Sequence, residues 1–134
     1  MASLLKVDAL TGVTTAGSIS VTGEGNSTTT NLQQGLAKAW ILFDGTGTIA
    51  ISDSFSVSSI SDGGTGYYTV TVSNAFSDAN YCVSESLAGS SAVCSTYNNY
   101  TMTSTAYQIG NRRVETTAFH DAKRANESFF GDLA

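Results

Sequence analysis

Few residues in this chain could do chemistry, and they are widely spaced. The one histidine, His120, stands beside Asp121. A catalytic dyad or triad needs a nucleophile within reach of such a pair, and no partnered Ser or Cys motif accompanies it in the sequence. We therefore interpret His120 as a solvated loop residue, and we predict no catalytic site, no metal site and no cofactor.

The glycine-rich motifs predict turns. DGTGT starts at Asp44 and DGGTGYY at Asp62, and neither has the GxGxxG spacing or the following helix of a phosphate-binding loop. Asp44, Asp53 and Asp62 are nine residues apart, a spacing unlike that of an EF-hand calcium loop. We expect these aspartates to cap turns.

Two clusters could contact a ligand. The first is a polar tip made of Tyr97, Asn98, Asn99 and Tyr100. Tyrosine rings stack on sugar faces and asparagine amides bond to hydroxyls, so a glycan contact is one interpretation; a plain turn with the tyrosines packed at its base is the favoured one. The second cluster is Arg112 with Arg113, which could hold an anionic glycan or, as the preferred hypothesis, pair with acidic residues of a neighbouring chain.

Two cysteines, Cys82 and Cys94, are too few for a disulfide framework or a metal site. If a hairpin turned near residues 87–90, they would lie nearly opposite each other and could form a cross-strand bridge. We expect both thiols to be buried and reduced, though close enough to bridge if oxidised. The opening residues lack the long apolar core of a signal peptide, so the chain is expected to be made in a cytoplasm.

The composition favours a β-rich protein. The 134 residues fit one domain, and only 13% of them are charged. There are 19 Ser, 18 Thr and 13 Gly but no Pro, a mixture that suits strands and turns better than helices. The net charge of −5 argues against a nucleic-acid partner, and no apolar run in the sequence is long enough for a membrane span.

Residues 1–36 differ from the rest of the chain. Small polar residues and glycines isolate their apolar residues, although SISV predicts a short strand and NLQQGLAKA a turn of helix. Such a segment cannot build a core alone, so we predict an extended stem or docking segment whose apolar residues are buried in a homotrimer. The candidate trimer interface consists of Leu4, Leu5, Val7, Leu10, Val13, Ile19, Val21 and Trp40.

Strong strand patterns begin at Ala39. AWILF is apolar on both faces and is therefore expected to be buried on both. In TIAISDSFSV, Asp53 interrupts an apolar face, which indicates a bulge or a sheet edge near it. That face consists of Ile49, Ile51, Phe55 and Val57.

The rest of the segment from 37 to 134 continues as short strands. YYTVTV alternates like a half-buried hairpin arm, with Tyr68, Val70 and Val72 on one face. DAKRAN, residues 121–126, is interpreted as a polar loop, and ESFFGDL as a last strand. We count about eight strands and predict an all-β fold, an antiparallel, jelly-roll-like β-sandwich head.

Several motifs between residues 37 and 83 occur together: AKAW, the turn F-D-GTGT-A, DSF-VSSI, GTG-YTV and DANY. With them, the segment resembles a module common at the ends of tail-fibre-like proteins of marine phages, including phages of cyanobacteria. The closing FFGDLA and the opening LKVDALTGVTTAGSI are similar as well. Ser77 and Ser52 depart from the family, which often has Pro and Arg there. The resemblance implies a β-rich, trimeric virion protein that displays a distal surface to a host, with no enzyme activity and no defined binding residues.

These expectations indicate a tail-fibre or receptor-binding subunit of a phage virion, assembled in the host cytoplasm. Its expected partners are further copies in a homotrimer, other virion proteins of the tail or capsid, and a host-surface glycan or protein. The alternative is a capsid decoration or head-fibre protein, which would share the fold, the trimer and the location. A polysaccharide-degrading tailspike is disfavoured, since its paired-carboxylate cleft does not fit the scattered glutamates Glu24, Glu85, Glu115 and Glu127.

Overall fold

The computed structural model describes residues 4–13, 19–23, 27–88, 94–96, 101–113 and 118–134. The chain divides into two compact units, Met1–Leu36 (unit 1) and Ala37–Ala134 (unit 2), at the position where the apolar pattern of the sequence changes. The described residues are mostly antiparallel β-sheet with one short helix, which confirms the all-β prediction.

Unit 1 contains a two-stranded sheet and one turn of helix. Strand β1 (Ser20–Thr22) pairs antiparallel with β2 (Thr29–Asn31), and α1 (Leu32–Gly35) follows at once. The side chain of Asn31 caps α1 by accepting bonds from the backbone N–H groups of Gln33 and Gln34, at 2.8 and 3.2 Å. The strand predicted in SISV and the helical turn predicted in NLQQGLAKA are thus confirmed.

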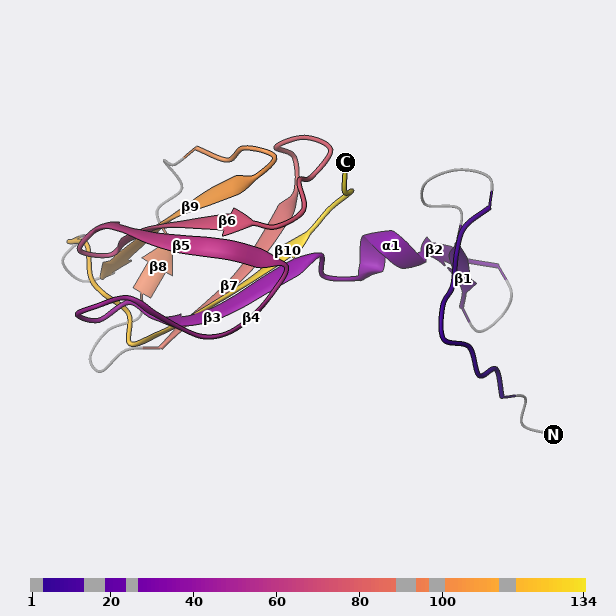
Figure 1. The fold of residues 1–134 in the computed structure, drawn as a ribbon, viewed down its shortest axis with the longest axis horizontal. Coiled ribbons are helices and arrows are strands. Elements are labelled where there is room, and N and C mark those ends of the chain that lie inside the picture. The colour runs from indigo at the N-terminus through magenta and orange to yellow at the C-terminus, as the bar shows by residue number, and fades with distance from the viewer. Residues whose placement is uncertain (1–3, 14–18, 24–26, 89–93, 97–100, 114–117) are drawn as a thin grey trace. The chain divides into compact units, whose positions relative to one another are not determined.

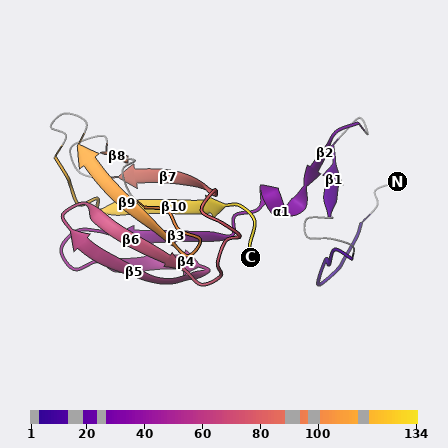
Figure 2. The same ribbon diagram turned by 90° about the horizontal axis from the view of Figure 1, so that it is seen from above.

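Unit 2 contains two four-stranded antiparallel sheets within its described residues (Figure 1). Sheet I has the order β4-β3-β10-β7, and these strands span Ala50–Phe55, Ala39–Asp44, Arg124–Phe130 and Cys82–Ala88. Sheet II has the order β5-β6-β9-β8, and these strands span Val57–Gly64, Tyr67–Val72, Ala106–Arg113 and Cys94–Thr96. Figure 2 shows the strands of sheet II lying across those of sheet I.

One hydrophobic core lies between the two sheets. The ring of Phe43 in sheet I meets that of Tyr68 in sheet II edge to face, with centroids 5.1 Å apart. Tyr107 and Phe129 make a second such contact, at 5.8 Å. Each pair contributes about 0.5–1.5 kcal/mol beyond the area that it buries. The predicted alternation of YYTVTV is confirmed, since its core face consists of the buried Tyr68, Val70 and Val72.

A corner at Ser56 carries the chain from sheet I to sheet II. β4 is an edge strand, and Ser52 is bulged out between Ile51, which pairs with Phe43, and Asp53, which pairs with Leu42. The bulge and edge predicted near Asp53 are therefore confirmed. The bulge and the charge of Asp53 both disfavour pairing of the β4 edge with a strand of another sheet.

The prediction of one continuous apolar face through Phe55 and Val57 is wrong. Ser56 takes a φ of 53°, in the left-handed region, and this reverses the side-chain alternation. Val57 consequently faces inward, opposite Val72. Phe55 points outward for an earlier reason: the bulge at Ser52 places Asp53 and Phe55 on the outer side of the sheet, opposite Ile51, and 52% of the surface of Phe55 is exposed.

Three other expectations need correction. β3 buries one face, whereas Trp40 and Leu42 on the other face are only half-buried. The predicted loop over 121–126 ends early, since β10 begins at Arg124. Cys82 and Cys94 do not lie on a shared hairpin, because β7 and β8 belong to different sheets; Cys82 is a free, exposed thiol.

Candidate functional site

Three segments meet at one end of unit 2, around a carboxylate that we call the Asp121 junction. Its Oδ1 atom accepts bonds from the N–H of Gly66 at 2.6 Å and from the hydroxyl of Tyr68 at 2.8 Å. The same hydroxyl lies 3.0 Å from the carbonyl oxygen of Gly45, whose own N–H donates to Ala122 at 2.9 Å. The β3–β4 turn, the β5–β6 turn and the segment before β10 are thereby fixed to one another.

Local side-chain bonds shape the two turns. Oδ1 of Asp44 accepts from the hydroxyl and the N–H of Thr46, at 2.6 and 2.8 Å, and these bonds lower the pKa of Asp44. Oδ1 of Asp62 accepts from the N–H of Gly64 at 2.8 Å. Asp44 and Asp62 therefore cap turns as predicted, whereas Asp53 lies within β4 and accepts from the N–H of Ser54.

His120 and Asp121 do not form a pair with each other. The N–H of His120 donates to the carbonyl of Asn111 at 3.0 Å, and its half-buried ring lies 3.3 Å from the guanidinium of Arg113. Asp121 bonds to Gly66 and Tyr68 instead. Both residues thus hold the segment before β10 in place, a structural task that their adjacency in the sequence did not reveal.

Of the two predicted ligand clusters, the structure describes one. Arg112 and Arg113 are half-buried at the end of β9, and the Arg112 guanidinium lies 4.4 Å from the ring centroid of Phe119. These contacts within the chain make both side chains less available to a ligand, whose binding stays a prediction. The other cluster, Tyr97, Asn98, Asn99 and Tyr100, lies outside the described residues.

The predicted trimer residues of unit 1 are mostly on its surface. Leu4, Leu5, Val7, Leu10, Val13 and Val21 are exposed, and Ile19 is half-buried. Trp40, in unit 2, is half-buried on the outer side of sheet I. The exposed side chains among them are available for contact with another chain, and the trimer stays a prediction.

A pair of glutamates inside unit 2 is the feature that sequence reasoning missed. Glu127 of β10 pairs directly with Glu85 of β7, and both face the core side of sheet I. The hydroxyl of Tyr107, from sheet II, donates to Oε1 of Glu85 at 2.5 Å. Glu127 is 1% exposed, and neither of its carboxylate oxygens has a hydrogen-bond partner among the described residues. The signal was available, since Glu127 shares its parity with the apolar Ala125 and Phe129.

This environment keeps Glu127 neutral. Burial, and then the neighbouring charge of Glu85, raise the pKa of Glu127 to about 9. Like charges directly opposite on paired strands repel, so a neutral Glu127 also relieves the pair. Because Glu127 is 1% exposed, we expect its protonation state to affect the stability of unit 2.

No helix among the described residues is long and apolar enough to cross a membrane. In the same part of the chain, no three His, Cys, Asp or Glu side chains gather where they could hold a metal ion. Comparison with protein-family models, with curated proteins and with solved structures found no match to this chain.

Gly66 and Gly47 give a matched test of the Asp121 junction. Both have positive φ, 67° and 68°, but a Cβ on Gly66 would lie 2.6 Å from the backbone nitrogen of His120, whereas one on Gly47 would meet nothing within 4 Å. Gly47→Ala should lower the free energy of unfolding by about 1–2 kcal/mol, because alanine is disfavoured at positive φ. Gly66→Ala should lower the free energy of unfolding by about 1–3 kcal/mol more, because the backbone of His120 would have to move away from the new methyl group. Equal denaturant midpoints for the two variants would contradict the junction.

Glu127→Gln tests the buried carboxyl. The pKa of Glu127 is about 9 in the folded chain, against about 4.3 in an unfolded one. Between these values the folded state binds more protons, so the contribution of Glu127 to stability is lost as pH rises towards 9. We expect the melting temperature to fall between pH 5 and 9 in the natural chain, by at least several degrees more than in Glu127→Gln.

The control for this experiment is Asp53→Asn, which changes an exposed carboxylate on the outer side of the same sheet. It should retain the pH dependence of the natural chain. A natural chain whose melting temperature stays level from pH 5 to 9, or changes in parallel with that of Glu127→Gln, would show that Glu127 is ionised in the folded state.

Proposed function

We propose that this protein is a structural subunit of a phage virion, a tail-fibre or receptor-binding subunit that displays unit 2 for host attachment. One observation carries the proposal: unit 2 has a buried apolar core of its own, whereas unit 1 exposes nearly all of its described apolar side chains. This contrast fits a display domain joined to an attachment segment. The resemblance of residues 37–83 to phage tail-fibre-like modules supports the same role.

The arrangement of unit 2 suits display. Its two sheets share one core, which supports the interpretation as a β-sandwich; a jelly-roll-like connectivity stays a prediction. The Asp121 junction fixes two turns and the segment before β10 at one end of the sheets. Loops held on a rigid scaffold are the usual place for recognition. We therefore propose that attachment uses loops of unit 2 and involves no catalysis.

The exposed residues of unit 1 support a homotrimer. Ordering a segment costs about 1–2 kcal/mol of backbone entropy per residue. Burying an apolar side chain returns about 1.5–3 kcal/mol, but in a single chain six of the seven candidate side chains in unit 1 are exposed, and the seventh, Ile19, is half-buried. Neighbouring copies would supply this burial and also accept the backbone bonds of the extended segments. A capsid decoration or head-fibre protein would use the same device, so location separates the two roles.

Antibody labelling tests the proposed role. An antibody raised against unit 2 is applied to intact particles of a phage that encodes this chain, and the label is located by electron microscopy. We expect gold at the tail, in few copies per particle. Label distributed over the capsid in hundreds of copies would replace the tail-fibre role with capsid decoration, and the absence of label from particles that contain every virion protein would overturn both.

A truncated chain beginning at Ala37 tests the role of unit 1. The full chain should be a trimer by light scattering, and the truncated one should be a monomer at the same concentration, because it lacks the apolar residues of unit 1. Monomers in both cases would refute the trimer. A truncated chain that remains trimeric would show that unit 2 drives assembly and would leave unit 1 as a dock for another virion protein.

A further inference from the structure

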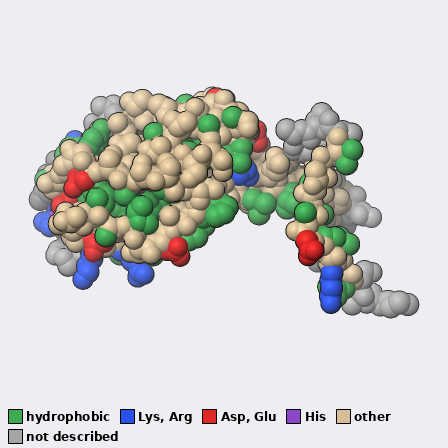
Figure 3. Space-filling view, in the orientation of Figure 1, with side chains coloured by type: hydrophobic (Ala, Val, Ile, Leu, Met, Phe, Trp, Pro, Cys, Tyr) green, Lys and Arg blue, Asp and Glu red, His purple; other side chains and the backbone are tan. Residues whose placement is uncertain are grey.

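The outer side of sheet I carries an apolar surface, which we call the Trp40 face. It consists of Trp40, Leu42, Phe55 and Phe130. Trp40 pairs with Phe55 across β3 and β4, so the two side chains lie on the same side of the sheet. Phe130 is the outward neighbour of the buried Phe129 at the end of β10. Figure 3 shows hydrophobic side chains over β3 and β4 in the lower part of unit 2.

Sheet II has a different outer side. Its outward positions on β5, β6 and β9 are mostly small and polar: Ser59, Ser61, Thr69, Thr71 and Gln108. Two sheets of one unit thus differ in what they present to their surroundings. The outer side of sheet II shows that this chain places small polar residues where a sheet faces water. The contiguous apolar residues of the Trp40 face therefore indicate a surface that contacts another molecule.

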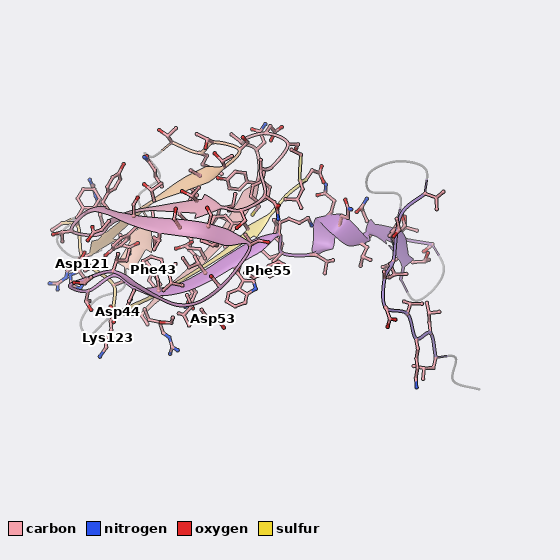
Figure 4. The ribbon with its side chains drawn as sticks, viewed as in Figure 1. Phe43, Asp44, Asp53, Phe55, Asp121 and Lys123 are labelled. Carbon is pink, nitrogen blue, oxygen red and sulfur yellow. The ribbon has the colours of Figure 1, made fainter. Side chains whose placement is uncertain are left out.

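Charge favours a second copy of this chain as the cover. The whole chain has a net charge of −5, so two copies repel each other overall. Acidic and basic residues both border the Trp40 face: Asp44 and Asp53 belong to β3 and β4, Lys123 and Arg124 lie at the start of β10, and Lys123 is close to Asp44 (Figure 4). Copies can therefore meet there with least repulsion, and acidic residues of one can lie near basic residues of the next.

The start of unit 2 leads directly onto this face. The N–H of Lys38 donates to the carbonyl of Phe129 at 2.8 Å, so the chain joins sheet I two residues before Trp40. An extended chain covers at most about 3.5 Å per residue. Copies that associate through unit 1 would consequently hold their Trp40 faces within a short distance of one another.

We propose that the Trp40 face packs against a second copy of this chain, with Phe55 as its most exposed anchor. The inference rests on the proposed homotrimer and adds the part of unit 2 that takes part in it. It also assigns a role to Phe55, which the sequence pattern had placed on the core side.

Photo-crosslinking in the intact chain tests the proposal. Phe55 is replaced by a benzophenone-bearing phenylalanine, which reacts with whatever lies beside it, and Ser61 on the outer side of sheet II is replaced in the same way as the control. We expect covalent products of two and three chains from position 55, with the linked peptide in β3, β4, β7 or β10 of the other copy, and none from position 61.

Light scattering on the same samples separates the possible failures. Trimers that give no product from position 55, or equal products from both positions, overturn the Trp40 face and leave the trimer intact. Monomers at all concentrations overturn the proposed trimer and this inference with it. As a second readout, Phe55→Ser should raise the concentration at which copies dissociate by about tenfold or more, whereas Leu133→Ser, at another exposed apolar residue, should not.

Discussion

Unit 2 depends on the insertion of its last strand, β10, between β3 and β7. Ser128 pairs with Trp40 on one side and with Ser84 on the other, and the same double pairing continues along the strand. Within the described chain, β3 and β7 have no backbone pairing with each other, so sheet I is incomplete until β10 is in place. β3 and β10 are the first and last strands of the unit, so their pairing closes a long loop. The entropy lost on closing that loop precedes the stabilising contacts, and we therefore predict slow folding.

Two features near β10 follow from this constraint. The Asp121 junction lies just before the strand and ties the entry of β10 to the turns of both sheets, which helps to fix the register in which β10 pairs. Glu127 lies in the middle of the strand and is buried once the sheet closes. A charged carboxylate there would cost several kcal/mol, which is why the neutral form prevails.

Much of unit 2 could be predicted from alternation and turn chemistry. The buried face of β6, the edge character of β4 and the caps at Asp44 and Asp62 all depend on residues close in sequence. The corner at Ser56 could not be predicted, because serine has no preference for positive φ and the conformation is imposed by the two sheets.

Contacts between segments distant in the sequence were the second kind of feature that could not be predicted from the sequence. The Asp121 junction and the pairing of Glu127 with Glu85 depend on sheet order, which alternation within a strand does not encode. The same is true of the cysteines, whose supposed hairpin required β7 and β8 to be neighbours. Arg112 and Arg113 were predicted as a ligand site from local composition, but their side chains contact Phe119 and His120 of the same chain.

We propose that the core of unit 2 is complete in one chain, whereas unit 1 is completed by other copies. Hydrogen exchange of the intact protein, followed by mass spectrometry over a range of concentrations that spans association, tests it most directly. We predict strong protection of β3, β6, β9 and β10 at every concentration, and protection of residues 4–13 and 19–22 only where copies associate. Protection of unit 1 in the monomer, or loss of protection in β10 on dilution, would contradict the account.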